Sequence, residues 1–444
     1  MLSDFTVKEK KDFRYRFYRA LTVWSIGNAL TSGLWAALMA VTISDLSWGT
    51  AIALAFSAYF AGNLSRLFSA SIVEKFRSYR KTTIFLYFFQ GIALITAALI
   101  FAFGQALGRG QPGLFFFFWF LSCVLENLGF VTLLSWMGNL FSRKTLGRLN
   151  GERERRRLWG EVPIVILTLI VLTIVAEIFF NGRYPENIAR IIYFLAFLLG
   201  GIFISASSLI LCRIAEKKMS LESVETDRQK WKFRWKYLKA PVRNPIFRWI
   251  LIYAFFCSLF IQMEQATRSS FQKELFSGDG VRFALVMGTF QLVTRLLQVT
   301  LAPWTGKQVD RFGTLFVMKI SQTLTAFALI FYAAAVFYPN PWLLFGAAIV
   351  WSSYVGINTA LPKIQLEFSQ HNEVSWSTAY GIFHGLGGFL GLGLGTIVFD
   401  YSQKFPKCIA LFFVMAFLLR LLLVTPLLAA EFVAKKEKTG SKSE

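Results

Sequence analysis

Gly306-Lys307-Gln308-Val309-Asp310-Arg311-Phe312-Gly313 is a short polar segment between two long apolar runs. Because each run is long enough to cross a bilayer, we expect the segment to be a loop that joins two membrane helices on the cytoplasmic side. Glycine allows close helix contact, and a carboxylate such as Asp310 is stabilised at a neighbouring helix N-terminus by the helix dipole. A solvated basic turn is the alternative interpretation, since short motifs also match by accident.

A degenerate copy, Ala70-Ser71-Ile72-Val73-Glu74-Lys75-Phe76, precedes this segment by close to half the chain length. The spacing suggests a duplicated molecule with two related halves. The charge types are retained, but the glycines are not, which leaves open whether the amino-half loop gates in the same way. The sequence therefore predicts two cytoplasmic gate loops, formed by Glu74, Lys75, Gly306, Asp310, Arg311 and Gly313.

The composition is that of an all-α integral membrane protein. Apolar residues make up 55% of the 444 residues, and charged residues make up only 16%, against about 25% in soluble domains. At about 20 apolar residues per spanning helix, the sequence predicts twelve transmembrane helices. They lie near residues 20–43, 49–70, 83–104, 113–140, 161–180, 189–212, 247–270, 281–303, 314–338, 342–366, 376–399 and 407–430.

The pattern Gly-x-x-x-Asp-Arg-x-Gly, placed between the eighth and ninth predicted spans, resembles the signature of the major facilitator superfamily of transporters. The segment 136–153 looks like the linker between spans four and five in many bacterial members, which indicates a bacterial-type branch. The resemblance implies two pseudo-symmetric six-helix bundles, over residues 1–212 and 247–444, with a cytoplasmic linker over 213–246. It also implies that spans one, four, seven and ten line a central cavity.

The net charge of +22 would favour a nucleic-acid partner in a soluble protein, but the position of the charges excludes this. Basic residues cluster on one side of the membrane if the spans alternate, in segments 8–19, 75–81, 143–157, 213–248 and 435–442. The positive-inside rule then predicts a multi-pass protein of the cell (inner) membrane with both termini in the cytoplasm. The same clusters fit anionic lipid headgroups. We expect the protein to be monomeric.

Span four carries Glu126 and Asn127 close to its midpoint. A charged carboxylate at mid-membrane costs about 3 kcal/mol, so it is seldom exposed to lipid and is a functional candidate. One interpretation of Glu126 is a proton-carrying residue, and the other is a structural pair with a basic residue on another helix.

Further polar residues recur in the other spans. Glu264 and Arg268 in span seven are four residues apart with the acid first, which favours a same-face ion pair that lines the pathway or caps the helix. Trp351 and Asn358 in span ten fit either an amphiphilic ligand or ordinary packing. The predicted pathway residues are Asn28, Glu126, Asn127, Glu264, Arg268, Trp351, Asn358 and His384.

His384 and Asn28 are each open to two interpretations. A histidine with an unperturbed pKa near 6.5 can relay protons, but a lone histidine is more often a packing residue. Asn28 faces a polar cavity or bonds to a neighbouring helix. The remaining intramembrane charges, Arg295 and Arg420, are expected to snorkel to the headgroups, with an anionic substrate as the second interpretation for Arg295. Alternating charges over 152–157 predict a solvated amphipathic helix.

Other functional classes lack their motifs. Thr305-Gly306-Lys307-Gln308 lacks the earlier glycine and the Ser or Thr of a phosphate-binding loop, and the glycines of span eleven do not fit a dinucleotide site. With only His371 and His384 and four scattered cysteines, no metal site is predicted. We therefore expect no enzyme and no cofactor. The prediction is a secondary active transporter of a small solute, a symporter or antiporter, with a transport-inactive receptor or assembly factor as the alternative.

Overall fold

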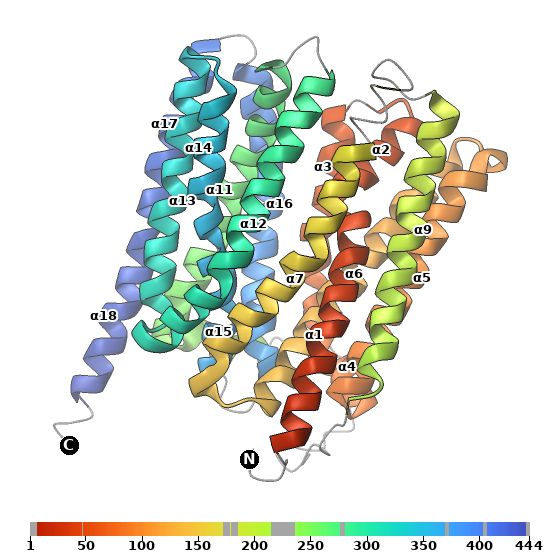
Figure 1. The fold of residues 1–444 in the computed structure, drawn as a ribbon. Coiled ribbons are helices and arrows are strands. Elements are labelled where there is room, and N and C mark those ends of the chain that lie inside the picture. Colours follow the sequence, from red (N-terminus) through yellow and green to blue (C-terminus); the bar gives the residue numbers. More distant parts are fainter. Residues whose placement is uncertain are drawn as a thin grey trace.

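The computed structural model describes residues 7–46, 48–171, 178, 185–214, 236–275, 280–368, 373–402 and 406–440. Within these ranges the regular elements are all helices, which run roughly along one direction (Figure 1). Both termini lie at the same end of the molecule (Figure 1), which is called the basic end below.

The amino-terminal half is built from helices that follow the first six predicted spans. They are α1 (Val7–Leu30), α2 (Gly33–Ile43), α3 (Trp48–Gly62), η1 (Asn63–Phe68), α4 (Ser69–Phe76), α5 (Tyr79–Phe103), η2 (Gly104–Leu107), α6 (Gly110–Leu140), η3 (Arg143–Thr145), α7 (Leu146–Leu169) and α9 (Glu186–Leu211).

The carboxyl-terminal half follows a short helix in the predicted linker. Its elements are α10 (Lys236–Arg243), α11 (Pro245–Leu275), α12 (Gly280–Phe312), α13 (Thr314–Phe337), α14 (Pro341–Trp351), η6 (Ser352–Tyr354), α15 (Val355–Glu367), α16 (Glu373–Ser402), α17 (Pro406–Leu422) and α18 (Val424–Gly440).

The described helices agree with the predicted all-α membrane fold. In the described residues, nine helical segments are long and apolar enough to cross a membrane. The other three predicted spans coincide with α3 and η1, with α7, and with α12. Three parts of the prediction lie largely outside the described residues: the second half of predicted span five, the linker over 213–246 and the last four residues.

The outer surface of the bundle is apolar along whole helices. On α9 and α13, exposed apolar residues recur every three or four positions, which is one face of a helix. They are Ile191, Leu195, Leu199 and Ile202 on α9, and Phe316, Ile320, Leu324 and Phe327 on α13. A water-soluble protein rarely exposes such continuous apolar stripes, so these faces are suited to contact with lipid.

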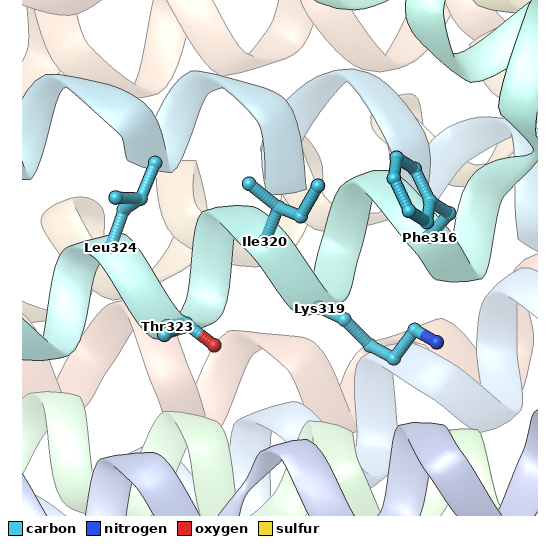
Figure 2. Close-up of a pocket in the computed structure, with 5 residues that line it drawn as sticks. All are labelled: Phe316, Lys319, Ile320, Thr323 and Leu324. Atoms are coloured by element: carbon cyan, nitrogen blue, oxygen red, sulfur yellow. The ribbon is translucent and has the colours of Figure 1, made fainter.

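A groove on the outer face of α13 lies within this apolar surface. Figure 2 shows its lining by Phe316, Lys319, Ile320, Thr323 and Leu324. Lys319 is its only charged residue, and that side chain is paired with Glu431 of α18. The groove is therefore a lipid-facing feature of one helix rather than a route through the molecule.

The octapeptide that opened the sequence analysis is not a loop. Residues 306–312 form the last turns of α12, and α13 begins at Thr314. Gly313 alone separates the two helices and has a φ of 92°. This left-handed conformation favours glycine, which has no Cβ to clash with the backbone. The turn therefore depends on Gly313, whereas Gly306 and Asp310 are held on a rigid helix.

The two halves pack against each other mainly at two places, and α15 also lies against α7. The α7 helix lies against α12, and α16 lies against α3 and η1. A buried apolar cluster joins the halves at the first of these places: Leu158, Val162, Val299, Ala302 and Val355. The other large clusters lie mainly within one half, so this contact is the apolar link that positions the site described next.

Predicted span ten is interrupted by the 3-10 turn η6. The Ser352 hydroxyl donates to the Ile349 carbonyl at 2.6 Å, and the Ser353 hydroxyl donates to the Val350 carbonyl at 2.8 Å. Such local bonds compete with the helical ladder and bend helices. The break therefore has a cause in the sequence, although we predicted a continuous helix.

Candidate functional site

Asp310 links the two halves at the basic end. Its Oδ1 accepts a hydrogen bond from the Gly147 N–H and its Oδ2 accepts one from the Arg148 N–H, both at 2.9 Å. These residues open α7, where the first N–H groups have no helical partner. Lys363 on α15 adds an ion pair with a 3.0 Å Nζ–Oδ1 distance. The predicted position of this carboxylate at a helix N-terminus is confirmed.

Small residues allow this contact to form. Gly147 and Gly151 of α7 lie against Gly306 and Ala302 of α12, so that two backbones from opposite halves touch. A Cβ on Gly306 would lie 2.6 Å from the Gly147 carbonyl oxygen, which is too close for any larger residue. The first glycine of the motif is therefore required by the crossing of the two helices.

Deeper along the same interface, charged side chains connect the halves. Arg157 pairs with Glu161 and, at 2.6 Å, with Glu154 on its own helix. From the other half, Arg295 lies 3.1 Å from Glu161 and the Asn358 amide donates to Glu154 at 3.3 Å. Arg295 thus has a direct partner in the buried Glu161 carboxylate of the other half, and its expected position at the headgroups stays a prediction.

The same contacts correct the expected solvated helix over residues 152–157. These residues belong to α7, which begins at Leu146, well before the predicted start of span five. Arg153 and Glu154 are only 8% and 3% exposed. Arg153 lies over the Phe130 ring of the amino-terminal half, whereas Glu154 accepts a hydrogen bond from Asn358 of the carboxyl-terminal half.

Arg66, which is not among the predicted pathway residues, lies at the second contact between the halves. This side chain is buried in η1, and both Nε and Nη2 donate to Asn127 Oδ1, at 3.1 and 2.8 Å. Its guanidinium lies over the Phe130 ring and against Gly381 of α16. The Thr378 hydroxyl of α16 also donates to the Arg66 carbonyl at 3.1 Å.

Glu126 is partly exposed beside this contact. Within the described part of the chain it forms no hydrogen bond or ion pair, and the charges of Arg66 and Arg157 act on it from a distance. The structural-pair interpretation therefore finds no direct partner among these residues. Asn127, its neighbour in sequence, is buried and bound to Arg66.

A second charged group lies inside the carboxyl-terminal half. The fully buried Glu264 accepts a hydrogen bond from Arg420 Nη2 at 2.8 Å, and the Arg268 Nη1 lies 3.8 Å away. The predicted same-face pair is present, but Arg420 is the nearer partner. Arg420 does not snorkel as expected: it is 0% exposed, because Glu264 and the Trp351 ring, 4.7 Å from its Cζ, surround it.

Two other predicted pathway residues lie in different surroundings. His384 on α16 lies between Tyr380 and Phe60, with ring centroids 5.8 and 5.9 Å apart, and Phe60 belongs to the other half. Asn28 is partly exposed on α1. The roles predicted for both residues stay predictions.

Of the predicted gate residues, Gly306 is buried and Asp310 is partly buried, whereas the other four are exposed. Glu74 and Lys75 lie in the last turn of α4, and Arg311 lies over the Phe312 ring at 4.9 Å. The two loops therefore differ: Asp310 is bound to the opposite half, whereas Glu74 is exposed at the surface.

Sequence reasoning missed Arg66, Glu154, Arg157 and Arg420 as site residues. Each carried the signal of a charge within or beside an apolar run. We assigned that charge to water or headgroups, because a single helix cannot show that a partner faces it from elsewhere in the fold. Among the described residues, no group of three histidines, cysteines or carboxylates could hold a metal ion.

Comparison with known proteins gives similarity at the level of structure alone. No protein-family model matches the sequence, and no curated protein is significantly similar to it. Solved structures do match over nearly the whole chain. The proton:xylose symporter XylE matches with a TM-score of 0.66 and 13% identity, covering 96% of this chain and 96% of that chain.

Two further transporters match in the same way. The fucose:proton symporter FucP of E. coli has a TM-score of 0.63 and 12% identity, covering 93% of this chain and 97% of that chain. The nucleoside transporter NupG has a TM-score of 0.60 and 12% identity, covering 93% and 99%. XylE and FucP are described as major facilitator superfamily proteins. The chain therefore has the fold of the major facilitator superfamily transporters.

Proposed function

We propose that this protein is a secondary active transporter of a small solute that works by rocking of its two helical bundles. The solved structures that share the fold are sugar and nucleoside transporters. Two bundles with a wetted chamber between them can expose a midplane site to each side in turn. The proposal places the bundles at residues 1–212 and 247–444, with the linker over 213–246.

The observation that carries the proposal is the contact between α7 and α12 at the basic end. Asp310 binds two N–H groups that belong to the opposite half. These bonds are broken if the bundles move apart there, and they satisfy donors that are otherwise free at a helix start. Asp310 and Gly306 thus form a latch that can open and close.

The predicted orientation completes the proposal. Both termini and the exposed basic residues are assigned to the cytoplasm, and the protein is assigned to the cell (inner) membrane as a monomer. The latch then closes the cytoplasmic side. Glu74 and Lys75 are proposed to serve the amino-half loop, although they differ from Asp310 in exposure.

Proton coupling is assigned to Glu126. This carboxyl group is partly exposed, has no direct partner among the described residues, and lies under the influence of two arginines. A carboxyl group that is accessible and not locked in an ion pair can take up and release a proton during a cycle. His384 and Asn28 are proposed to line the same pathway.

A transport-inactive receptor or assembly factor on the same fold is the second candidate. Buried ion pairs join the two halves along α7. If this contact between the halves never opens, the pairs are purely structural, and that favours the receptor or assembly factor. The alternative requires that the two bundles keep one arrangement.

The deciding experiment is reconstitution into liposomes with imposed proton and sodium gradients and a panel of labelled metabolites. Gradient-driven accumulation of at least one solute supports the transporter. If a proton gradient drives this accumulation and Glu126→Gln abolishes it, proton coupling through Glu126 is supported as well. If Glu126→Gln leaves ligand binding and all flux intact, proton coupling through Glu126 is wrong. Binding of a ligand with no flux under any gradient supports the receptor.

A further inference from the structure

The buried cluster of Glu264, Arg268, Arg420 and Trp351 carries one positive charge more than its partners neutralise. Two arginines face a single carboxylate, and Glu264 is the only acid that pairs with either of them within the described part of the chain. A buried unpaired charge is costly in any protein and more so at membrane depth. Within the described residues the cluster therefore has a net charge of +1 and needs one further negative charge to be neutral.

The hydrogen bonds of the cluster are also incomplete, on the two donor atoms of Arg420 and on one acceptor oxygen of Glu264. Arg420 Nε and Nη1 and Glu264 Oε2 are buried atoms with no hydrogen-bond partner, and both side chains are 0% exposed. Buried polar atoms are nearly always paired, and exceptions call for an explanation. The free Nε–H and Nη1 groups of Arg420 are donors that an anionic group can fill.

Arg268 and Trp351 are the partly exposed members of the cluster. The Arg268 side chain is 13% exposed, whereas those of Glu264 and Arg420 are fully buried. Both guanidinium groups lie over the Trp351 ring, at 5.0 and 4.7 Å. Trp351 is itself partly exposed and ends α14, and Asn358 on the continuing α15 reaches the opposite half.

The geometry points to a carboxylate-binding subsite in the carboxyl-terminal half, so that the transported solute is a small organic monoanion. Arg268 and Arg420 bind its carboxylate, and Glu264 holds Arg420 in position. This inference rests on the proposed function and names the substrate class. One uncompensated charge fits a monoanion rather than a phosphate ester, which carries nearly two negative charges at neutral pH.

The test compares probes of nearly equal shape in which a carboxylate is replaced by a neutral amide. Purified full-length protein in lipid nanodiscs is titrated with benzoate and benzamide, and with lactate and lactamide, at constant salt, by calorimetry and thermal unfolding. We expect at least one carboxylate to bind at least about tenfold more tightly than its amide, the factor expected from a charge-assisted bond. This comparison needs no variant.

The variant chosen is Arg268→Gln, because Arg420 is fully buried and its loss endangers folding. Arg268→Gln is expected to weaken carboxylate binding about tenfold or more while leaving amide binding unchanged. Arg109→Gln is the matched control, because Arg109 is an exposed arginine at the start of α6 and lies outside the cluster. Amides that bind as tightly as carboxylates, or an Arg268→Gln variant with full carboxylate affinity, overturn the inference.

Failure of this inference is distinguishable from failure of the proposed function. Transport of a neutral or cationic solute that no carboxylate inhibits overturns the subsite and leaves the transporter standing. Carboxylate binding that depends on Arg268 without flux under any gradient supports the subsite and refutes the transporter.

Discussion

The sharpest prediction concerns the latch at Asp310, which Asp310→Ala removes. The carboxylate accepts two N–H bonds at 2.9 Å from the start of α7 and an ion pair at 3.0 Å from Lys363. A hydrogen bond to a charged group contributes about 1.5–3 kcal/mol. In the open arrangement water replaces the two N–H donors of α7, whereas Lys363 belongs to the same half as Asp310 and keeps its contact, so we take roughly 3 kcal/mol as the difference between the two arrangements. This corresponds to about a hundredfold shift in their ratio, at 1.4 kcal/mol per tenfold.

The assay measures the distance between α7 and α12 at the basic end. Cysteines placed at the exposed positions Lys144 and Lys307 carry spin labels or a dye pair, in a background where the accessible Cys212 and Cys408 are serines. We expect Asp310→Ala to deplete the short-distance population. The step that re-forms the contact becomes slower, so exchange slows more than ligand affinity changes.

Asp12→Ala is the matched control. Asp12 lies at the same end, but it is 53% exposed and pairs only with Arg16 on its own helix, a contact worth little. If Asp310→Ala lowers ligand affinity while the distance distribution and the exchange rate stay normal, the latch is refuted.

Three further predictions follow from single contacts. Gly306→Ala puts a Cβ 2.6 Å from a backbone oxygen of the opposite half, so we expect the labelled α7–α12 distance to lengthen. Gly113→Ala meets nothing within 4 Å and is expected to leave this distance unchanged. Equal distances in both variants contradict the close crossing of the two helices. Glu126→Gln abolishes proton-driven accumulation but retains solute exchange between equal concentrations, and loss of both in flux assays assigns Glu126 to binding instead. Arg420→Gln leaves Glu264 buried beside a weaker partner and destabilises the protein by about 3 kcal/mol; the thermal unfolding midpoint then falls, and an unchanged midpoint contradicts the pairing.

The sequence alone was sufficient for the membrane class and the helix count. Apolar runs of spanning length must be helical in lipid, because only a helix satisfies its own backbone bonds there. The position of Asp310 at a helix N-terminus was also predictable, since the motif joins a carboxylate to small residues that permit contact. The helical structure of the motif was not predictable, because a polar segment can form either the last turns of a helix or the loop that follows it.

The partners of the charged residues depended on the tertiary structure. Arg295 and Arg420 both lie in apolar runs, and snorkelling is the natural expectation for each. Arg295 pairs with Glu161 of the other half, and Arg420 with Glu264 of α11 in its own half. Nothing in the local sequence distinguishes these outcomes, because helix spacing shows which residues share a face but not what that face meets.

The sequence by itself thus determined that the chain forms membrane helices in two related halves, since hydropathy and each copy of the motif are properties of residues that are neighbours in sequence. The tertiary structure alone decided which charges meet: Asp310 with the start of α7, Arg66 with Asn127, and Arg268 and Arg420 with Glu264. The physical reason is that a buried charge is stabilised by whatever group lies within a few ångströms, and that distance is set by packing between helices far apart in sequence.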